Sequence, residues 1–456
     1  MLHCGEAAPG TIRLLYALHE LAYYGAAPLR QTARLARDFW GSPLNPASET
    51  DAGRSLFAAA EMTTELTRRY GRPDWRIDTV EIGGVDVRVR KQTVWSSPWV
   101  NLVHFTREAA DLRRAGCTGM QPTVLIVAPL SGHYATLLRG TVRTFLQDHE
   151  VYVADWSNAR DVPVFEGRFD FYDYVDHIRE MLRQLGPRPH VVAVCQPGPC
   201  VLAAAALMAE DGESSRPASM CFMGSPIDAR LSPTVPNQLA EQRPFAWFQQ
   251  NMIQTVPAPY PGMMRRVYPG YVQLFSFMSL NTDKHVDAHW RYFQDLVKGD
   301  GDAAEKHREF YDEYLSVLDL TEEFYLQTVD LVFQRYALAK GELEHRGRPV
   351  RPEAITDIAL ITVEGENDDI SGVGQTQAAH VVCPNIPAEL RELYVQPKVG
   401  HYGVFNGRRF EQEIYPRVRA FIGEHEPELP RAETGLQPKN RFGRAAAEEA
   451  PPMAHA

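Results

Sequence analysis

Three side chains that together can catalyse acyl transfer follow predicted strands. Cys195 closes the apolar stretch 190–195, and Asp368 and His401 come after two later stretches of the same kind. A thiolate attacks a carbonyl carbon, a histidine moves the proton, and a carboxylate fixes the tautomer of the histidine. The sequence therefore predicts Cys195 as nucleophile, His401 as general base and Asp368 as its orienting acid.

The order of these residues along the chain is that of the α/β-hydrolase triad. In that fold the nucleophile sits in a sharp turn between a strand and a helix, where small neighbours are needed. Ala193 stands two residues before Cys195 and meets this need. Pro197 stands two residues after it and departs from the G-x-S-x-G pattern, and Gly198 follows directly. We expect Gly198 to relieve the crowding, and proline is tolerated early in a helix.

Two nearby residues offer alternatives for the acid and the base. Asp369 is a second candidate acid, and we prefer Asp368 because it lies three residues after Gly365. His133 is a candidate base, but it precedes the nucleophile and is out of order. We therefore assign His133, together with Trp156, to substrate binding.

An acyl-transfer site also needs donors for the developing oxyanion. The residue after the nucleophile supplies one main-chain N–H, and here it is Gln196. The second donor should come from the loop 128–136 after the first core strand, and we expect Leu130 or Ser131. Each such donor contributes about 3–4 kcal/mol of transition-state stabilisation.

Strands and helices alternate from residue 120 onward, which predicts a mostly parallel sheet with helices on both faces. The strands are expected at 123–129, 151–156, 190–195 and 218–226, and the helices at 135–148, 170–186 and 201–208. The alternation stops over residues 228–350, which are helical and aromatic in pattern and predict an inserted cap. It resumes with strands at 357–366 and 392–401 and a closing helix at 408–425.

The N-terminal part has a different pattern. Helices are expected over 11–38, interrupted near Gly25 and Pro28, and over 51–69, and a β-hairpin is expected to turn at Gly83–Gly84. The N-terminal helices either pack on the sheet or serve in docking. The predicted organisation is a helical segment (1–70), a first core part (71–227), the cap (228–350), a second core part (351–426) and a disordered tail (427–456).

Composition excludes several classes of protein. The formal net charge of −11 argues against nucleic-acid binding. The six cysteines include no C-x-x-C pair, so we expect neither a metal site nor disulfides, and Cys200 and Cys221 should be inert core thiols. No signal peptide and no stretch that would span a membrane is visible. We expect a cytoplasmic protein that needs no cofactor.

The chain resembles the intracellular polyhydroxyalkanoate (polyhydroxybutyrate) depolymerases of the α/β-hydrolase superfamily from about residue 11 to 425. The motifs that carry the resemblance are TVLIVAPLSGHYATLLRGTVRTFL, VYVADWSNARDVPVFEGRFDFYDYVDHI, VCQPGPCVLAA, MGSPIDARLSPTVPNQLA, TVEGENDDISGVGQT and KVGHYGVFNGRRF. The cysteine, aspartate and histidine of that family fall on Cys195, Asp368 and His401.

The resemblance implies an enzyme that cleaves ester bonds of amorphous poly(3-hydroxybutyrate) at the surface of storage granules. Water or coenzyme A is the acyl acceptor, and the absence of an obvious phosphate-cradling loop favours water. The rival interpretations are a polyester synthase, a thioesterase and a non-catalytic granule-coat protein. The sequence A-V-C-Q-P argues against the first, because synthases usually have G-x-C-x-G. The aromatic cap also suits a homodimer.

Overall fold

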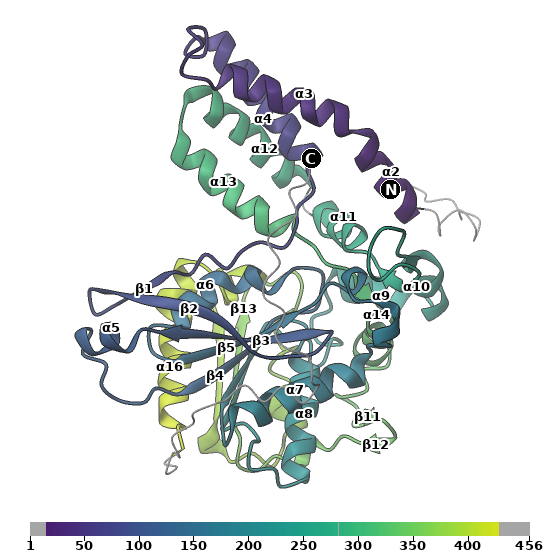
Figure 1. The fold of residues 1–456 in the computed structure, drawn as a ribbon. Coiled ribbons are helices and arrows are strands. Elements are labelled where there is room, and N and C mark those ends of the chain that lie inside the picture. Colours follow the sequence, from purple (N-terminus) through teal and green to yellow (C-terminus); the bar gives the residue numbers. More distant parts are fainter. Residues whose placement is uncertain (1–14, 281, 428–456) are drawn as a thin grey trace.

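The computed structural model describes residues 15–280 and 282–427, and its centre is a nine-stranded sheet (Figure 1). From one edge to the other the strands are β1 (Thr79–Ile82), β2 (Val85–Ser96), β3 (Val100–Arg107), β5 (Glu150–Trp156), β4 (Thr123–Val127), β6 (His190–Val194), β7 (Ser219–Met223), β13 (Ala359–Gly365) and β14 (Arg391–Gln396). Pairings from β1 to β5 are antiparallel and those from β5 to β14 are parallel. The predicted fold class, an α/β hydrolase with a mostly parallel sheet, is confirmed.

Helices cover both faces of this sheet. They are α7 (Phe171–Leu185) and α8 (Gly198–Glu210) on one face, and α5 (Ala109–Arg114), α6 (Arg139–Phe145) and α16 (Tyr415–Glu424) on the other. Because side chains alternate along a strand, β4 serves both cores. Leu125 and Val127 pack with the first pair of helices, and Val124 and Ile126 pack with the second group.

The antiparallel edge of the sheet contains one predicted and one unpredicted feature. The expected hairpin is confirmed as β1 and β2, with Gly83 and Gly84 at φ of 56° and 77°. Two successive positive φ angles suit the twist of a two-residue hairpin turn. β3 was not predicted, because its buried residues, which include the adjacent Leu102 and Val103, do not alternate strictly.

A long insertion separates β7 from β13, over the range that we assign to the cap. Its elements are α9 (Val235–Gln242), α10 (Phe245–Asn251), β8 (Gln254–Thr255), β9 (Arg266–Tyr268), α11 (Gly270–Leu280), α12 (Thr282–Lys298), α13 (Gly301–Tyr314), β10 (Leu320–Thr321), α14 (Glu322–Thr328), a π-helix (Val329–Gln334), β11 (Glu344–His345) and β12 (Arg348–Pro349). A short helix, α15 (Ala379–Val382), follows β13. Most of its helices stand at the end of the sheet where the parallel strands finish, while β11 and β12 lie beside α7 and α8 (Figure 1).

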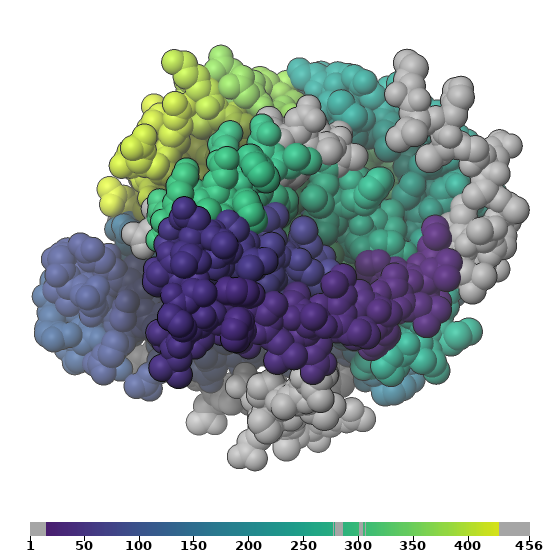
Figure 2. Space-filling model, turned by 90° about the horizontal axis from the view of Figure 1, so that it is seen from above, coloured from purple at the N-terminus to yellow at the C-terminus, as the bar shows by residue number. Residues whose placement is uncertain are grey.

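The N-terminal helices extend this cap rather than cover the sheet. They are α2 (Leu15–Gly25), α3 (Ala27–Trp40) and α4 (Asp51–Thr67), and α4 packs on α12. The predicted interruption is confirmed, since α2 ends at Gly25 and Pro28 lies in the first turn of α3. Figure 2 shows this purple segment lying across one face of the molecule beside the green segment of the cap.

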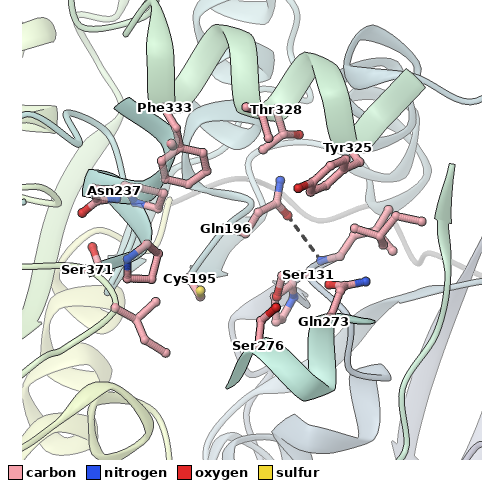
Figure 3. A pocket seen from close by; sticks show the side chains of 18 of the residues that line it. Ser131, Cys195, Gln196, Asn237, Gln273, Ser276, Tyr325, Thr328, Phe333 and Ser371 are labelled. Atoms are coloured by element: carbon pink, nitrogen blue, oxygen red, sulfur yellow. Dashed lines mark hydrogen bonds between the residues drawn. The ribbon is translucent and has the colours of Figure 1, made fainter. Parts of the chain in front are cut away.

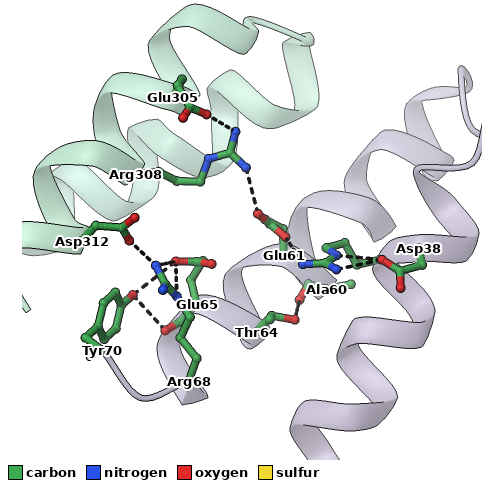
Figure 4. A network of polar contacts seen from close by, with 11 residues as sticks. Asp38, Ala60, Glu61, Thr64, Glu65, Arg68, Tyr70, Glu305, Arg308 and Asp312 are labelled. Carbon is green, nitrogen blue, oxygen red and sulfur yellow. Dashed lines mark hydrogen bonds and ion pairs between the residues drawn. The ribbon is translucent and has the colours of Figure 1, made fainter. Parts of the chain in front are cut away.

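Ion pairs fasten these helices to one another (Figure 4). Arg68, directly after α4, pairs with Glu65 on that helix and with Asp312 on α13. The buried carboxylate of Glu61 lies 3.3 Å from Arg308 on α13 and 3.6 Å from Arg37 on α3. Charges from segments distant in sequence therefore join α3, α4 and α13 into one helical lobe.

No helix in residues 15–280 and 282–427 has the length and apolar character that crossing a membrane requires. Residues 11–14 of the first predicted helix, and residues 428–456 of the predicted tail, lie outside the described residues.

Candidate active site

Cys195 occupies a strained turn between β6 and α8. Its φ is +66°, a conformation that residues other than glycine rarely adopt and that is concentrated at functional sites. The N–H of Cys195 donates to the carbonyl of Met223 at 2.8 Å, which ties the turn to the neighbouring strand. The close approach that demands a small residue falls on Gly198, where a Cβ would lie 2.4 Å from that of Ser225. Gly198 thus supplies the clearance that Pro197 cannot.

Asp368 and His401 meet at the ends of the two strands that follow the cap. The Oδ2 atom of Asp368 lies 2.8 Å from Nδ1 of His401. Its other oxygen accepts hydrogen bonds from the N–H groups of Ile370 and Ser371, at 2.9 and 2.8 Å, so the carboxylate is held in one orientation. The structure therefore places Asp368, and not the exposed Asp369, against the histidine.

The charge state of His401 follows from its neighbours. Burial opposes a charged imidazole, but the charge of Cys195 and the hydrogen bond and charge of Asp368 raise the pKa of His401 well above its ordinary value. With Nδ1 directed to Asp368, Nε2 is the nitrogen left for the thiol. The thiolate is the nucleophilic form of a cysteine. Cys200 and Cys221 are buried in the core, as expected, and burial raises the pKa of both thiols.

Two residues that the sequence analysis missed support this pair. Gly224, directly after β7, has φ of +57°, and a Cβ there would come within 3.1 Å of Cε1 of His401. The fully buried carboxylate of Glu364, at the end of β13, accepts hydrogen bonds from the N–H groups of Gly374, Thr376 and Gln377. It thereby holds the loop that follows Asp368. A glycine inside the predicted strand 218–226 was the available signal for Gly224, and no signal in the sequence pointed to Glu364.

The predicted oxyanion donors lie beside the nucleophile. Within the described residues, the main-chain N–H groups of Gln196 and Ser131 have no acceptor. The N–H of Leu130 donates to Oε1 of the Gln196 side chain at 3.3 Å. The cap holds this loop in place, because the N–H of Leu318 donates to the carbonyl of Gly132 at 2.7 Å. A substrate carbonyl that enters the site would meet Gln196 N–H together with a donor from this loop.

Cys195 and His401 open into a cavity of about 460 Å³ between the sheet and the cap (Figure 3). The cap contributes a mainly apolar wall, whose side chains include those of Val235, Leu239, Trp247, Phe248, Met252, Leu320, Phe324, Tyr325, Val329 and Phe333. A cavity of this size and character suits an apolar ligand with few polar groups.

The two residues assigned to substrate binding have different surroundings. His133 lines the cavity, and its Nε2 donates to the carbonyl of Tyr314 at 3.1 Å. Burial lowers the pKa of His133 to about 4, so the ring is neutral at neutral pH. Trp156 does not line the cavity, and that prediction is wrong. Its indole is buried in the core, stacked 4.0 Å from Tyr174, and donates to the carbonyl of Ala128 at 3.0 Å.

Within the residues that the structure describes, no three His, Cys, Asp or Glu side chains are arranged to hold a metal ion. The residues of the site support nucleophilic attack on a carbonyl, proton transfer by a histidine, and stabilisation of an oxyanion by main-chain N–H groups.

Comparison with known protein families finds one match, in the later part of the chain. Residues 224–426 match the family described as PHB de-polymerase C-terminus. This segment begins at Gly224 and contains both Asp368 and His401. No curated protein matches the chain as a whole.

Similar solved structures include the monoacylglycerol lipase of Paleococcus ferrophilus, with 13% identity, a TM-score of 0.37 and coverage of 67% of this chain and 96% of that one. A soluble variant of monoglyceride lipase from Saccharomyces cerevisiae is 10% identical, with a TM-score of 0.41 and coverage of 74% and 96%. A thermophilic esterase from Thermogutta terrifontis is 13% identical, with a TM-score of 0.37 and coverage of 74% and 99%. Likenesses this weak add nothing to what the sheet order shows. Residues 224–426 thus resemble the C-terminus of PHB depolymerases, the fold is that of an α/β hydrolase, and the protein is a carboxylic ester hydrolase.

Proposed function

We propose that the protein is a depolymerase that cleaves the ester bonds of amorphous poly(3-hydroxybutyrate), with Cys195 as nucleophile. The observation that carries the proposal is the contact between His401 and Asp368 beside a strained cysteine on the wall of an apolar cavity. The match to the PHB depolymerase C-terminus supports the choice of polymer. Polyhydroxybutyrate has no charged groups along its chain, which agrees with the apolar cap wall.

Acylation would begin when the Cys195 thiolate attacks the carbonyl carbon of an ester. The carbonyl electron pair moves to oxygen, and the N–H groups of Gln196 and of Leu130 or Ser131 stabilise the oxyanion. When the carbon–oxygen bond of the ester breaks, protonated His401 gives its proton to the departing alkoxide. The products are a shortened chain with a hydroxyl end and an acyl thioester on Cys195.

Deacylation would use the same groups in the opposite roles. Neutral His401 takes a proton from water as the water oxygen attacks the thioester carbonyl. Collapse of the second tetrahedral intermediate releases a hydroxyacid or an oligomer and restores the thiolate and the imidazolium. Coenzyme A is an alternative acceptor, in which case its thiol attacks and an acyl-CoA leaves. A positioned base of this kind contributes roughly 10²–10⁴ in rate.

The proposed partner is the granule surface, and the proposed place of action is the polymer granule in the cytoplasm. Large apolar side chains on α2 and α3 face solvent, among them Leu21, Leu35 and Phe39, which are 65%, 66% and 58% exposed. Burying apolar area gains roughly 25 cal/mol per Å², so several such side chains would hold the enzyme on an apolar polymer. This is the docking role that the N-terminal helices would have.

The activity is tested with native amorphous poly(3-hydroxybutyrate) granules and the purified protein. Wild type is expected to release soluble 3-hydroxybutyrate or its oligomers, and Cys195→Ala is expected to release none. Equal release by both proteins would contradict the assignment of the nucleophile. No release by the wild type would contradict the assignment of the polymer.

Docking is tested separately by sedimenting the inactive Cys195→Ala protein with granules. Replacing Leu21, Leu35 and Phe39 together with Gln is expected to move most of the protein to the supernatant. The control is Val381→Gln, since this residue is 78% exposed but lies on α15. Unchanged sedimentation of the triple variant would contradict docking through α2 and α3.

A further inference from the structure

The cavity wall contains a side-chain donor that the protein leaves without an acceptor. Asn237 lies on α9, lines the cavity with Cys195, and is only 4% exposed (Figure 3). Within the described residues its Nδ2 has no hydrogen-bond partner. A buried donor that lacks an acceptor costs about 1–3 kcal/mol, so its presence calls for a physical explanation.

Contacts with the other end of the amide fix its orientation. Oδ1 of Asn237 accepts from the N–H of Thr234 at 2.9 Å and from Nε2 of Gln375 at 2.9 Å. If the amide were turned over, an NH₂ group would face these two donors. Asn237 therefore keeps its oxygen for the protein, and its NH₂ group is the end left for a ligand.

The side-chain amide of Gln196, next to the nucleophile, also has its oxygen bonded within the protein and its NH₂ group without an acceptor among the described residues. Its Oε1 atom accepts from the N–H of Leu130. The cavity thus has two unsatisfied amide donors set in a largely apolar wall. A ligand that satisfies them must bring acceptors, and it must otherwise be apolar.

A polyester chain has this chemistry. Each repeating unit carries an ester carbonyl, which accepts hydrogen bonds, and the chain has no N–H or O–H donor except at one end. We infer that Asn237 Nδ2 binds the carbonyl oxygen of an ester unit next to the one being cleaved. This inference rests on the proposed function and adds a specificity determinant: Asn237 distinguishes a polyester from an isolated ester.

The structural role of Asn237 must be separated from this binding role, because its oxygen also caps α9. Asn237→Asp keeps the acceptor for Thr234 and Gln375 and removes only the donor. Asn237→Glu also keeps a side-chain acceptor and removes the donor. It places a glutamate, a usual residue of the capping box, three positions after Thr234. The matched control is Gln238→Glu, which adds the same charge to the same helix on an exposed side chain.

The experiment compares two substrates, a linear trimer of 3-hydroxybutyrate and the single ester p-nitrophenyl acetate. For Asn237→Asp and Asn237→Glu, kcat/KM for the trimer is expected to fall about tenfold, with kcat/KM for the single ester and the melting temperature unchanged. Gln238→Glu should match the wild type on both substrates. An equal fall on both substrates, or no fall on either, would overturn the inference and leave Asn237 as a helix cap.

Binding without turnover separates failure of this inference from failure of the proposed function. The trimer is expected to raise the melting temperature of Cys195→Ala, and the added Asn237→Asp change should reduce that rise. If the wild type cleaves neither substrate, the proposed function fails. If the trimer stabilises Cys195→Ala and the double variant equally, the assignment of Asn237 fails.

Discussion

Gly224 lies against the imidazole of His401, so that a side chain at this position would press on the ring. A Cβ on Gly224 would meet Cε1 of His401 at 3.1 Å and Nδ1 at 3.3 Å, and Oδ2 of Asp368 lies 3.4 Å away. These are atoms of the acid–histidine contact itself. The loop after β7 therefore forms a wall behind the triad, and the N–H of Gly224 ties it to β13 by donating to the carbonyl of Val363 at 2.9 Å.

Gly224→Ala is expected to lower kcat by at least about tenfold, because the new methyl group displaces the His401 ring from its position beside Cys195. The positive φ adds about 1–2 kcal/mol of destabilisation. Gly212→Ala is the matched control. Its φ is +64°, but a Cβ there meets no atom within 4 Å. Steady-state kinetics and urea unfolding should show similar losses of stability in both variants, with kcat reduced only in Gly224→Ala. A normal kcat in Gly224→Ala would contradict the contact.

Glu364→Gln is expected to destabilise the fold and to reduce activity. The carboxylate accepts from main-chain N–H groups of three loop residues and from Nε2 of Gln377. Replacing one of its oxygens with NH₂ sets a donor against donors, for a loss of roughly 2–3 kcal/mol in the free energy of unfolding. Glu366→Gln changes an exposed side chain that accepts from the main-chain N–H of Lys398. It should change the free energy of unfolding by less than about 0.5 kcal/mol. Equal unfolding midpoints for the two variants would show that Glu364 does not hold the loop.

The pH profile should report the raised pKa of His401. A raised pKa means that the imidazolium persists to higher pH, so a proton remains available for the leaving alkoxide above the ordinary histidine pKa of about 6.5. We expect kcat/KM to hold above that pH and to decline only as the pH passes the raised value. Asp368→Asn removes the negative charge that helps to raise this pKa, so the decline should move to lower pH. NMR titration of the His401 ring provides the independent reading, and a midpoint in Asp368→Asn at or above that of the wild type would contradict the account.

The sequence predicted the parts of the site that local pattern determines. Cys195, Asp368 and His401 each follow an apolar strand, and the carboxyl ends of parallel strands converge at one edge of a sheet. Their order along the chain, which is that of the α/β-hydrolase triad, then led to the prediction that the three side chains form one site. The turn at Gly83–Gly84 was predictable for the same reason, since two glycines between alternating stretches determine a hairpin.

The remaining parts depend on contacts between distant segments, which a single sequence does not display. Trp156 is the last residue of β5, yet its indole turns into the core to reach Tyr174 and Ala128. Glutamate is usually exposed, but Glu364 is buried because a later loop supplies N–H groups that donate hydrogen bonds to its carboxylate. The pairing of Arg68 with Asp312 likewise joins segments 244 residues apart.

The central claim is that Cys195 carries the acyl group, and trapping that intermediate tests it most directly. The wild type is mixed with the 3-hydroxybutyrate trimer, quenched in acid within the first turnover, digested and analysed by mass spectrometry. We predict a hydroxybutyryl adduct on the peptide that contains Cys195, which neutral hydroxylamine removes as it does a thioester. Turnover of the trimer with no adduct on this peptide, or with the adduct on a different residue, would contradict the account.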